Sequence, residues 1–550
     1  MKRILAAAAV LAGTLLGGAA TARADAALPP LQLPAGPVEG IHSADGAARV
    51  WLGLPYAQPP VGALRWQPPW PMPPWQEVRR ADAFGSPCAQ TGSMYGPPPP
   101  GKAWGIDNVE TFGKSVGSED CLTLNVWRPD SEEHGLPVLV FVHGGANVAG
   151  YSADPTYDGA RLAVAAKAVV VTINYRLGIF GWFADPVLQG ADPLANSGEF
   201  GILDIIQSLR FVQANIAAFG GDPGNVTLMG QSAGAIDIYA IIGSKLAGGL
   251  FHKAIVLSGL IGSGGKPNQH SYATDLAAEL ARRDGLAATP EAAAKLLAAK
   301  GAPWIKDYLL SRSSAEILDA MHRNPALAKP PPTPGDGVVL PLDLTAAYDQ
   351  GQFQRVPMII GTTRDEAKLF TGKLLKVGNE QRFRMMLQSN PDAAPKYRTT
   401  DLISPYLLPW LSSGPYDFCN WLLSAVLGRG VNASIDKVAR YEPRAYAYRF
   451  DWDRGPQPWK TVYGAAHAID LPFIFGNFGS GFFAMDFSAR NRPGREALSG
   501  VMMQAIGAFL RSGDPNVPAL GLRWQPWHDG GTRQKLVLDA SEQGLNLSLH

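Results

Sequence analysis

Short apolar runs rich in β-branched residues recur along the chain, and turn residues bound each of them. Runs of this kind indicate strands that are buried on both faces, as in a parallel sheet covered by helices. The predicted strands span residues 138–143, 168–174, 226–229, 253–258 and 356–361.

Segments with helical spacing of apolar residues lie between these runs, at 158–167 and 203–219. Strands that alternate with helices predict an α/β fold with a mostly parallel sheet. Three more helical stretches, at 272–283, 290–300 and 315–321, carry little strand signal. We expect them to form an insertion packed over the sheet, within one large domain that spans residues 25–550.

The N-terminus has the pattern of a secretory signal peptide. Lys2 and Arg3 precede an apolar run over residues 4–20, and Ala22-Arg23-Ala24 provides a small-residue cleavage site. We therefore expect residues 1–24 to be removed and the protein to be exported, to the periplasm or beyond. A retained membrane anchor is the weaker interpretation, because glycine and threonine interrupt the run.

Composition excludes two broad classes of protein. The 550 residues are 46% hydrophobic and 17% charged, the reverse of a disordered chain. The formal net charge is only +1, so no overall field favours nucleic acid as a partner. The 61 glycines and 46 prolines instead indicate a large globular protein with many turns.

Three cysteines follow the apolar N-terminus, and an exported protein can keep disulfides. Cys88 and Cys121 enclose a segment rich in glycine and proline, and we expect them to pair. Cys419 lies in an aromatic stretch and is expected to be a buried free thiol. The cysteines and histidines do not cluster as zinc ligands do, and we expect no metal site.

The motif Gly230-Gln231-Ser232-Ala233-Gly234 follows the predicted strand at 226–229 and precedes an apolar, helix-compatible stretch. In G-x-S-x-G the glycines permit a tight strand-to-helix turn that exposes the serine hydroxyl. The motif alone could be an ordinary turn in a glycine-rich chain. In this context it predicts that Ser232 is a nucleophile.

A serine nucleophile needs N–H donors for the oxyanion that its attack creates. The sequence His143-Gly144-Gly145-Ala146 directly follows another predicted strand. We predict that Gly145, Ala146 and Ala233 donate their backbone N–H groups, with Gly144 as the supporting turn. His143 precedes the serine in the chain and is expected to orient the loop rather than act as the base.

The chain resembles the type-B carboxylesterase/cholinesterase-like family of the α/β-hydrolase fold over nearly all of its mature length. The matching blocks occur in the family's order, and the family's usual disulfide corresponds to Cys88 and Cys121. The blocks are WLGLPYAQPPVGALRWQPP, SEDCLTLNVWRP, VTINYRLGIFGW and LRFVQANIAAFGGDPGNVTLMGQSAGA. The resemblance implies a serine esterase with helical insertions over its active site, a small-molecule ester as substrate and no cofactor.

The same resemblance implies the acid and the base. GTTRDEAKLF is similar to the family's acid loop and places the acid on Glu366, with Asp365 as the alternative. YGAAHAIDLPFIFG is similar to its histidine loop and places the base on His467, while Asp470 is expected to be structural. The order Ser232, Glu366, His467 is the order that this fold requires.

The sequence departs from the family pattern at three positions. Gln231 stands where the family usually has Glu, Glu199 where it usually has Asn, and Ala146 where a third glycine is common. Gln231 keeps hydrogen bonding beside the nucleophile but removes a negative charge. One hypothesis is that the enzyme tolerates anionic acyl groups, such as those of polycarboxylate esters; neutral drift is the alternative.

Two other functions remain open from the sequence. Relatives that have lost the nucleophile or the base act as non-catalytic binding proteins, although Ser232, Glu366 and His467 are all present here. An interfacial lipase would need an amphipathic lid, and the segment between Cys88 and Cys121 has no strong apolar face. Trp104 in that segment could line the entrance to the site.

Overall fold

The computed structural model describes residues 27–262, 271–328, 335–403, 414–528 and 533–550. The predicted signal peptide, residues 1–24, lies outside this part of the chain. An eleven-stranded sheet runs through the molecule in the order β16-β15-β14-β13-β12-β11-β9-β10-β8-β4-β3. Its strands are β3 (Ile41–His42), β4 (Ala48–Pro55), β8 (Thr123–Pro129), β9 (Leu136–Val142), β10 (Val169–Ile173), β11 (Gly221–Gln231), β12 (Lys253–Leu257), β13 (Met358–Thr363), β14 (Ala445–Phe450), β15 (Lys535–Leu538) and β16 (Ser548–Leu549).

The middle of this sheet is parallel and its two ends are antiparallel. All neighbouring pairs from β10 through β9 and β11 to β15 are parallel. The pairs β10/β8, β8/β4, β4/β3 and β15/β16 are antiparallel. The five predicted strands correspond to β9–β13, so the sequence pattern located the parallel centre of the sheet.

Each central strand is buried on both faces because successive side chains point to opposite sides. In β9, Val138, Val140 and Val142 pack into one hydrophobic cluster, whereas Leu139 and Phe141 pack into another. A continuous apolar run is therefore the expected sequence of such a strand, and a polar residue in it would be buried.

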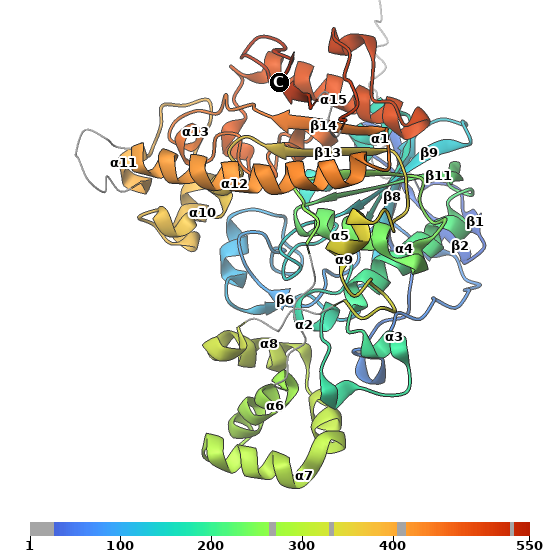
Figure 1. The fold of residues 1–550 in the computed structure, drawn as a ribbon, viewed down its shortest axis with the longest axis vertical. Coiled ribbons are helices and arrows are strands. Elements are labelled where there is room, and N and C mark those ends of the chain that lie inside the picture. Colours follow the sequence, from blue (N-terminus) through green and yellow to red (C-terminus); the bar gives the residue numbers. More distant parts are fainter. Residues whose placement is uncertain (1–26, 263–270, 329–334, 404–413, 529–532) are drawn as a thin grey trace, which may run out of the picture.

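Helices cover both faces and supply the other half of each cluster. Helices α4 (Phe200–Asn215) and α5 (Ala233–Gly243) pack on one face, and α1 (Ala160–Ala166) and α15 (Arg492–Ser512) on the other. Figure 1 shows α15 on one side of the strands and α4 and α5 on the opposite side. The predicted helices at 158–167 and 203–219 correspond to α1 and α4.

The predicted helices at 272–283, 290–300 and 315–321 exist, but they do not pack over the sheet. Helices α6 (Tyr272–Arg283), α7 (Pro290–Leu310) and α8 (Ser314–Arg323) pack chiefly against one another. They form the lobe at the bottom of Figure 1, away from the eleven-stranded sheet. The expectation of an insertion over the sheet is wrong for these helices. Their apolar faces pack against one another within the lobe, and against β6, β7 and a turn at Pro186–Leu188.

Further helices lie in the segments that follow β13 and β14 in the chain. These are α10 (Asn379–Leu387), α11 (Thr399–Leu402), α12 (Gly414–Ala439), α13 (Trp459–Val462) and α14 (Leu471–Phe475). Smaller elements complete the described fold: β1 (Leu31–Leu33), β2 (Gly36–Glu39), β5 (Arg79–Arg80), β6 (Gln90–Thr91), β7 (Ser115–Val116), α2 (Gly178–Gly181), α3 (Pro193–Asn196) and α9 (Leu344–Asp349).

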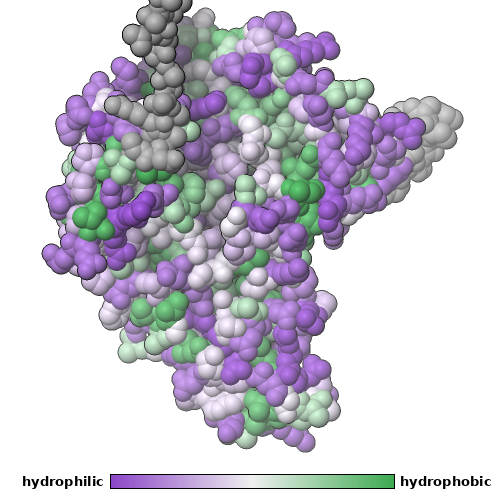
Figure 2. All heavy atoms as spheres, turned by 180° about the vertical axis from the view of Figure 1, so that it is seen from behind, coloured by the Kyte–Doolittle hydropathy of each residue, from purple (hydrophilic) through white to green (hydrophobic). Residues whose placement is uncertain are grey.

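The surface is mixed in polarity. The face in Figure 2 is covered mainly by hydrophilic side chains, with smaller separate hydrophobic patches between them. Within the described ranges, no helix combines the length and the apolar character that a bilayer span requires.

The register of the central strands brings their carboxyl ends together. Val142 of β9 pairs with Gly230 of β11, Gln231 pairs with Leu257 of β12, and Leu257 pairs with Gly361 of β13. Ligands of open α/β sheets bind at this edge of the strands. The loops after β9, β11 and β13 are the ones that the sequence analysis singled out.

Candidate active site

Ser232 lies at the sharp turn between β11 and α5. Its backbone has φ 57° and ψ −121°, a strained conformation for a residue with a side chain. Its N–H donates to the carbonyl of Leu257 at 2.8 Å, which fixes the turn to the next strand. The hydroxyl-bearing side chain is half-buried and lines a pocket. This is the elbow that the sequence predicts.

The two glycines of the elbow are required by close approach of backbone. A Cβ on Gly230 would lie 2.5 Å from the carbonyl oxygen of Gly234, and one on Gly234 would lie 2.3 Å from that of Val142. Both distances are shorter than real Cβ contacts. Glycine at these positions lets α5 begin directly against the end of β9.

The loop after β9 passes close to the elbow. A Cβ on Gly144 would lie 2.9 Å from Cβ of Ser232, and Gly145 and Ala146 both have positive φ, 112° and 56°. Within the described chain, the N–H groups of Gly145 and Ala146 take part in no hydrogen bond. The N–H of Ala233 lies in the first turn of α5, where a helix leaves donors unpaired. Three backbone donors with no partner among the described residues therefore lie on the two segments that meet at Ser232.

Side chains from three other segments hold this loop. Gln90 accepts from the N–H of Gly150 at 3.0 Å and donates to its carbonyl at 2.9 Å. Asn147 donates to Asp237 of α5 at 2.9 Å, and the hydroxyl of Tyr175 donates to the carbonyl of His143 at 2.7 Å. No local pattern in the sequence indicates these supports, because each joins residues that are far apart in the chain.

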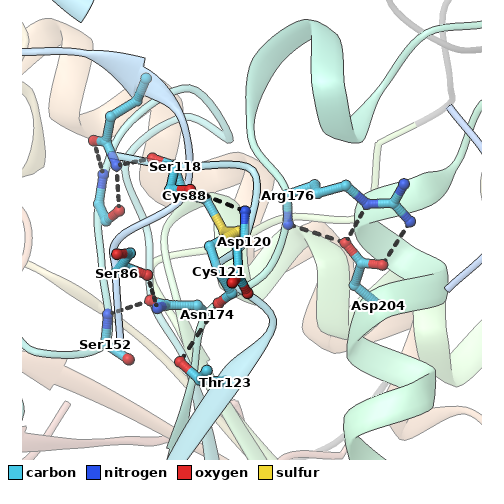
Figure 3. The surroundings of a disulfide bond; sticks show 12 residues. Ser86, Cys88, Ser118, Asp120, Cys121, Thr123, Ser152, Asn174, Arg176 and Asp204 are labelled. Atoms are coloured by element: carbon cyan, nitrogen blue, oxygen red, sulfur yellow. Dashed lines mark hydrogen bonds and ion pairs between the residues drawn. A yellow bond between two sulfur atoms is a disulfide. The ribbon is translucent and has the colours of Figure 1, made fainter. Parts of the chain in front are cut away.

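A disulfide between Cys88 and Cys121 fastens the neighbouring segment, as predicted. Figure 3 shows Asn174 beside this bond, where it donates to the carbonyl of Ser86 at 3.0 Å and accepts from the N–H of Ser152 at 2.8 Å. The disulfide thus lies in a hydrogen-bonded frame that continues to the end of the loop after β9.

Glu366 follows β13 and is buried, with 3% of its surface exposed. Its Oε1 accepts from the hydroxyls of Ser258 and Thr362 at 2.5 and 2.6 Å and from the N–H of Thr363 at 2.8 Å. Burial alone raises the pKa of Glu366, but the charge of His467 and these hydrogen bonds outweigh it and lower the pKa to about 2. The carboxylate is therefore ionised across the ordinary pH range.

His467 lies between Glu366 and the elbow. Its Nδ1 makes a short hydrogen bond with Oε2 of Glu366, and its Nε2 lies 3.0 Å from the side-chain nitrogen of Gln231. An amide nitrogen only donates, so Nε2 acts as acceptor and the proton of the neutral ring is on Nδ1. No hydrogen bond links Ser232 to His467 among the described residues, although both line the same pocket.

The alternative acid, Asp365, has different partners. Its Oδ2 accepts from Arg364 at 2.7 Å and from the N–H of Ala465 at 3.0 Å, so it fastens the loop that carries His467. Asp470 accepts from the hydroxyl of Tyr448 at 2.8 Å, and burial raises its pKa to about 6. Glu366 is the carboxylate that contacts the imidazole.

His143 is buried and stacks on Tyr175 with 4.6 Å between ring centroids. Burial lowers its pKa to about 4, and its Nδ1 lies 2.8 Å from the carbonyl of Gly144. The ring is therefore neutral and contacts the loop after β9 rather than Ser232.

A pocket of about 810 Å³ opens over Ser232 and His467. Aromatic residues contribute much of its wall, and Trp104 is among them. The segment 369–382, which ends in α10, contributes a second wall with Lys373, Lys376 and Arg382. Asp154 is the one acidic residue among the described lining residues, and burial raises its pKa.

Cys419 differs from its prediction. It is a free thiol, but it is exposed on α12 rather than buried. Its neighbours Phe418 and Trp421 are also exposed, so the aromatic stretch around it faces outward. The aromatic composition predicted burial because a local pattern does not show which side of a helix meets the core.

Residues 28–548 match the Carboxylesterase family. The chain belongs to this family. It is 31% identical over 507 residues to the para-nitrobenzyl esterase of Bacillus subtilis (strain 168), covering 92% of this chain and 94% of the relative. It is 30% identical over 494 residues to the fumonisin B1 esterase of Sphingopyxis macrogoltabida, covering 88% and 81%.

Solved carboxylesterases share the fold. A PNB esterase structure matches with a TM-score of 0.69 and 28% identity, covering 94% of this chain and 97% of that one. A carboxylesterase of Geobacillus stearothermophilus matches with a TM-score of 0.67, 28% identity and the same coverage. The protein is therefore a carboxylic ester hydrolase of the α/β-hydrolase fold, and its substrates are small-molecule esters.

Proposed function

We propose that this carboxylesterase hydrolyses esters through Ser232 as nucleophile, His467 as base and Glu366 as the acid that orients His467. The observation that carries the proposal is the hydrogen-bonded line from Glu366 through Nδ1 of His467, which leaves Nε2 unprotonated beside the elbow. A base must hold a free lone pair toward the nucleophile before it can accept its proton.

The proposed reaction has two halves. Nε2 of His467 accepts the Ser232 proton as the hydroxyl oxygen attacks the ester carbonyl, and the imidazolium is stabilised by Glu366. The proton then passes to the leaving alcohol, and water hydrolyses the acyl-enzyme by the same route. The N–H groups of Gly145, Ala146 and Ala233 stabilise the oxyanion in both halves.

In this scheme Gln231 must release Nε2 before the reaction begins, because one lone pair cannot serve two donors. Catalytic hydrogen bonds are often absent without substrate and form only in the complex. We infer that substrate binding moves the Gln231 amide aside and lets the Ser232 hydroxyl take its place.

We further propose that the enzyme is exported and that it tolerates anionic acyl groups such as those of polycarboxylate esters. Export is supported by the sequence of residues 1–24 and by the Cys88–Cys121 disulfide. Tolerance of anions is supported by the neutral Gln231 beside Ser232 and by the excess of basic residues in the pocket wall.

The experiment is a screen of the mature protein against an ester panel that includes a para-nitrobenzyl ester, fumonisin B1 and polycarboxylate esters. Ser232→Ala should lower kcat by 10³-fold or more on every ester that the parent hydrolyses, on the order of the loss seen in other serine hydrolases. Retention of full activity by Ser232→Ala would overturn the triad.

A further inference from the structure

Arg382 is a buried cation without a carboxylate partner among the residues that the structure describes. It lies on α10, lines the active-site pocket and has 3% of its surface exposed. Nη2 donates to Oδ1 of Asn379 at 2.9 Å and to Sδ of Met94 at 3.2 Å. Nε and Nη1 are buried and have no hydrogen-bond partner in the described chain. Both of its contacts are neutral, so the charge stays uncompensated.

The groups that the structure describes around Arg382 do not neutralise it. The buried carboxyl group of Asp486 acts on Tyr463 as Arg382 does, but burial raises the pKa of Asp486 well above its ordinary value. Its charge acts on three phenols, but burial raises their pKa values, so they stay neutral; they are Tyr95, Tyr416 and Tyr463. On its own helix, Glu380 forms an ion pair with Arg384 at 3.1 Å. On the neighbouring turn at Ile106–Thr111, Oδ2 of Asp107 forms an ion pair with Nζ of Lys102 at 3.6 Å.

An unpaired buried charge is costly, and proteins keep such a cost chiefly where function requires it. Guanidinium groups bind carboxylates through two parallel hydrogen bonds, which makes arginine suited to recognise them. Gly372, also in the pocket wall, comes so close to Arg382 that a Cβ on it would lie 2.7 Å from Nη1. A side chain at position 372 would therefore collide with the guanidinium, and glycine leaves the space that Arg382 occupies in the pocket wall.

We propose that Arg382, with Lys373 at the exposed rim of the pocket, binds a carboxylate on the acyl chain of the ester substrate. The inference rests on the proposed hydrolysis at Ser232 and deepens it, because it names the residues of the pocket wall that recognise the anionic acyl group of a dicarboxylic or polycarboxylic ester. The bound carboxylate supplies the counter-charge that the described chain does not. Lys373 contributes less, because an exposed ammonium is screened by solvent.

The test compares two esters that differ mainly in a terminal carboxylate, mono-4-nitrophenyl glutarate and 4-nitrophenyl pentanoate. Arg382→Gln should lower the ratio of their kcat/KM values, glutarate over pentanoate, by about tenfold or more. Arg384→Gln is the matched control, since Arg384 is on the same helix but exposed and paired with Glu380. A ratio that is unchanged in Arg382→Gln, or lowered equally in Arg384→Gln, overturns the proposal.

A binding measurement separates this inference from the proposed catalysis. Free glutarate should raise the Tm of Ser232→Ala more than pentanoate does. The increase that glutarate causes should be smaller in Ser232→Ala/Lys373→Gln. This measurement requires no enzymatic activity, and it does not depend on whether Arg382→Gln folds. Equal shifts from glutarate and pentanoate overturn the inference even if the triad is correct, whereas an active Ser232→Ala overturns the triad and leaves this result standing.

Discussion

Gln231 is the residue at which the local chemistry of the site differs most from the pattern that the sequence resembles. Its amide donates to Nε2 of His467 and its side chain is almost fully buried. A carboxylate at this position could only accept, so it would pair with the protonated imidazole instead. Gln231 therefore favours the neutral base and keeps negative charge away from the acyl group.

Gln231→Glu tests this account. The new carboxylate should stabilise protonated His467, which cannot accept the serine proton. We expect the acidic limb of the kcat/KM profile for a neutral ester to move to higher pH. We also expect kcat/KM to fall further for an anionic ester than for a matched neutral one, because like charges repel at short range.

The control is Gln352→Glu, which adds the same charge at an exposed position outside the pocket. It should leave both the pH profile and the ratio between the two esters unchanged. An equal loss of kcat/KM on both esters in Gln231→Glu would refute charge selectivity and would favour neutral drift.

The element that matters most for the site is the turn from β11 into α5. Close backbone approach at this turn makes Gly234 part of the contact between α5 and the end of β9. Ser232 depends on the same contact, since its strained backbone persists only while its surroundings hold it.

Gly234→Ala should therefore cost about 1–3 kcal/mol of stability through overpacking and should also lower kcat. Gly428→Ala is the matched control, because a Cβ on this α12 glycine meets open space and alanine favours a helix. We expect Gly428→Ala to be neutral or slightly stabilising, with kcat unchanged. Thermal unfolding and kcat on one neutral ester measure both effects, and a Gly234→Ala protein with parental values would contradict this reading of the turn.

At the scale of the whole molecule, the disulfide fastens the segment that supports the loop after β9. Cys88 and Cys121 are separated by 33 positions, and closing such a loop stabilises a fold by about 4 kcal/mol on the chain-entropy account. The paired variant Cys88→Ser/Cys121→Ser should lose roughly this free energy of unfolding in urea.

Cys419→Ser provides the control for that loss. Because Cys419 is exposed and unpaired, its replacement should leave the urea midpoint unchanged. A midpoint that falls in Cys419→Ser as much as in the paired variant would show that loss of a thiol, rather than loss of the cross-link, causes the effect.

Local patterns predicted much of the fold because its centre is made of strands and helices whose burial is periodic. The five apolar runs correspond to β9–β13, and the motif at Ser232 does form a strand-to-helix turn. Boundaries were less accurate: β11 begins at Gly221, five residues before the predicted strand, because pairing with β9 extends it. The position of α6–α8 and the exposure of Cys419 depend on contacts between distant segments, and no local pattern contains them.

The sequence by itself determined the family, the parallel centre of the sheet and the candidate nucleophile, because short motifs and periodic burial are local properties. Only the tertiary structure decided which carboxylate contacts His467, that the Gln231 amide donates to Nε2, and that Arg382 lies in the pocket wall with no counter-charge from the described residues. Each of these depends on groups many positions apart. Strand register and packing bring some of these groups within hydrogen-bond distance and leave others unpaired. A local sequence pattern does not show which groups will meet.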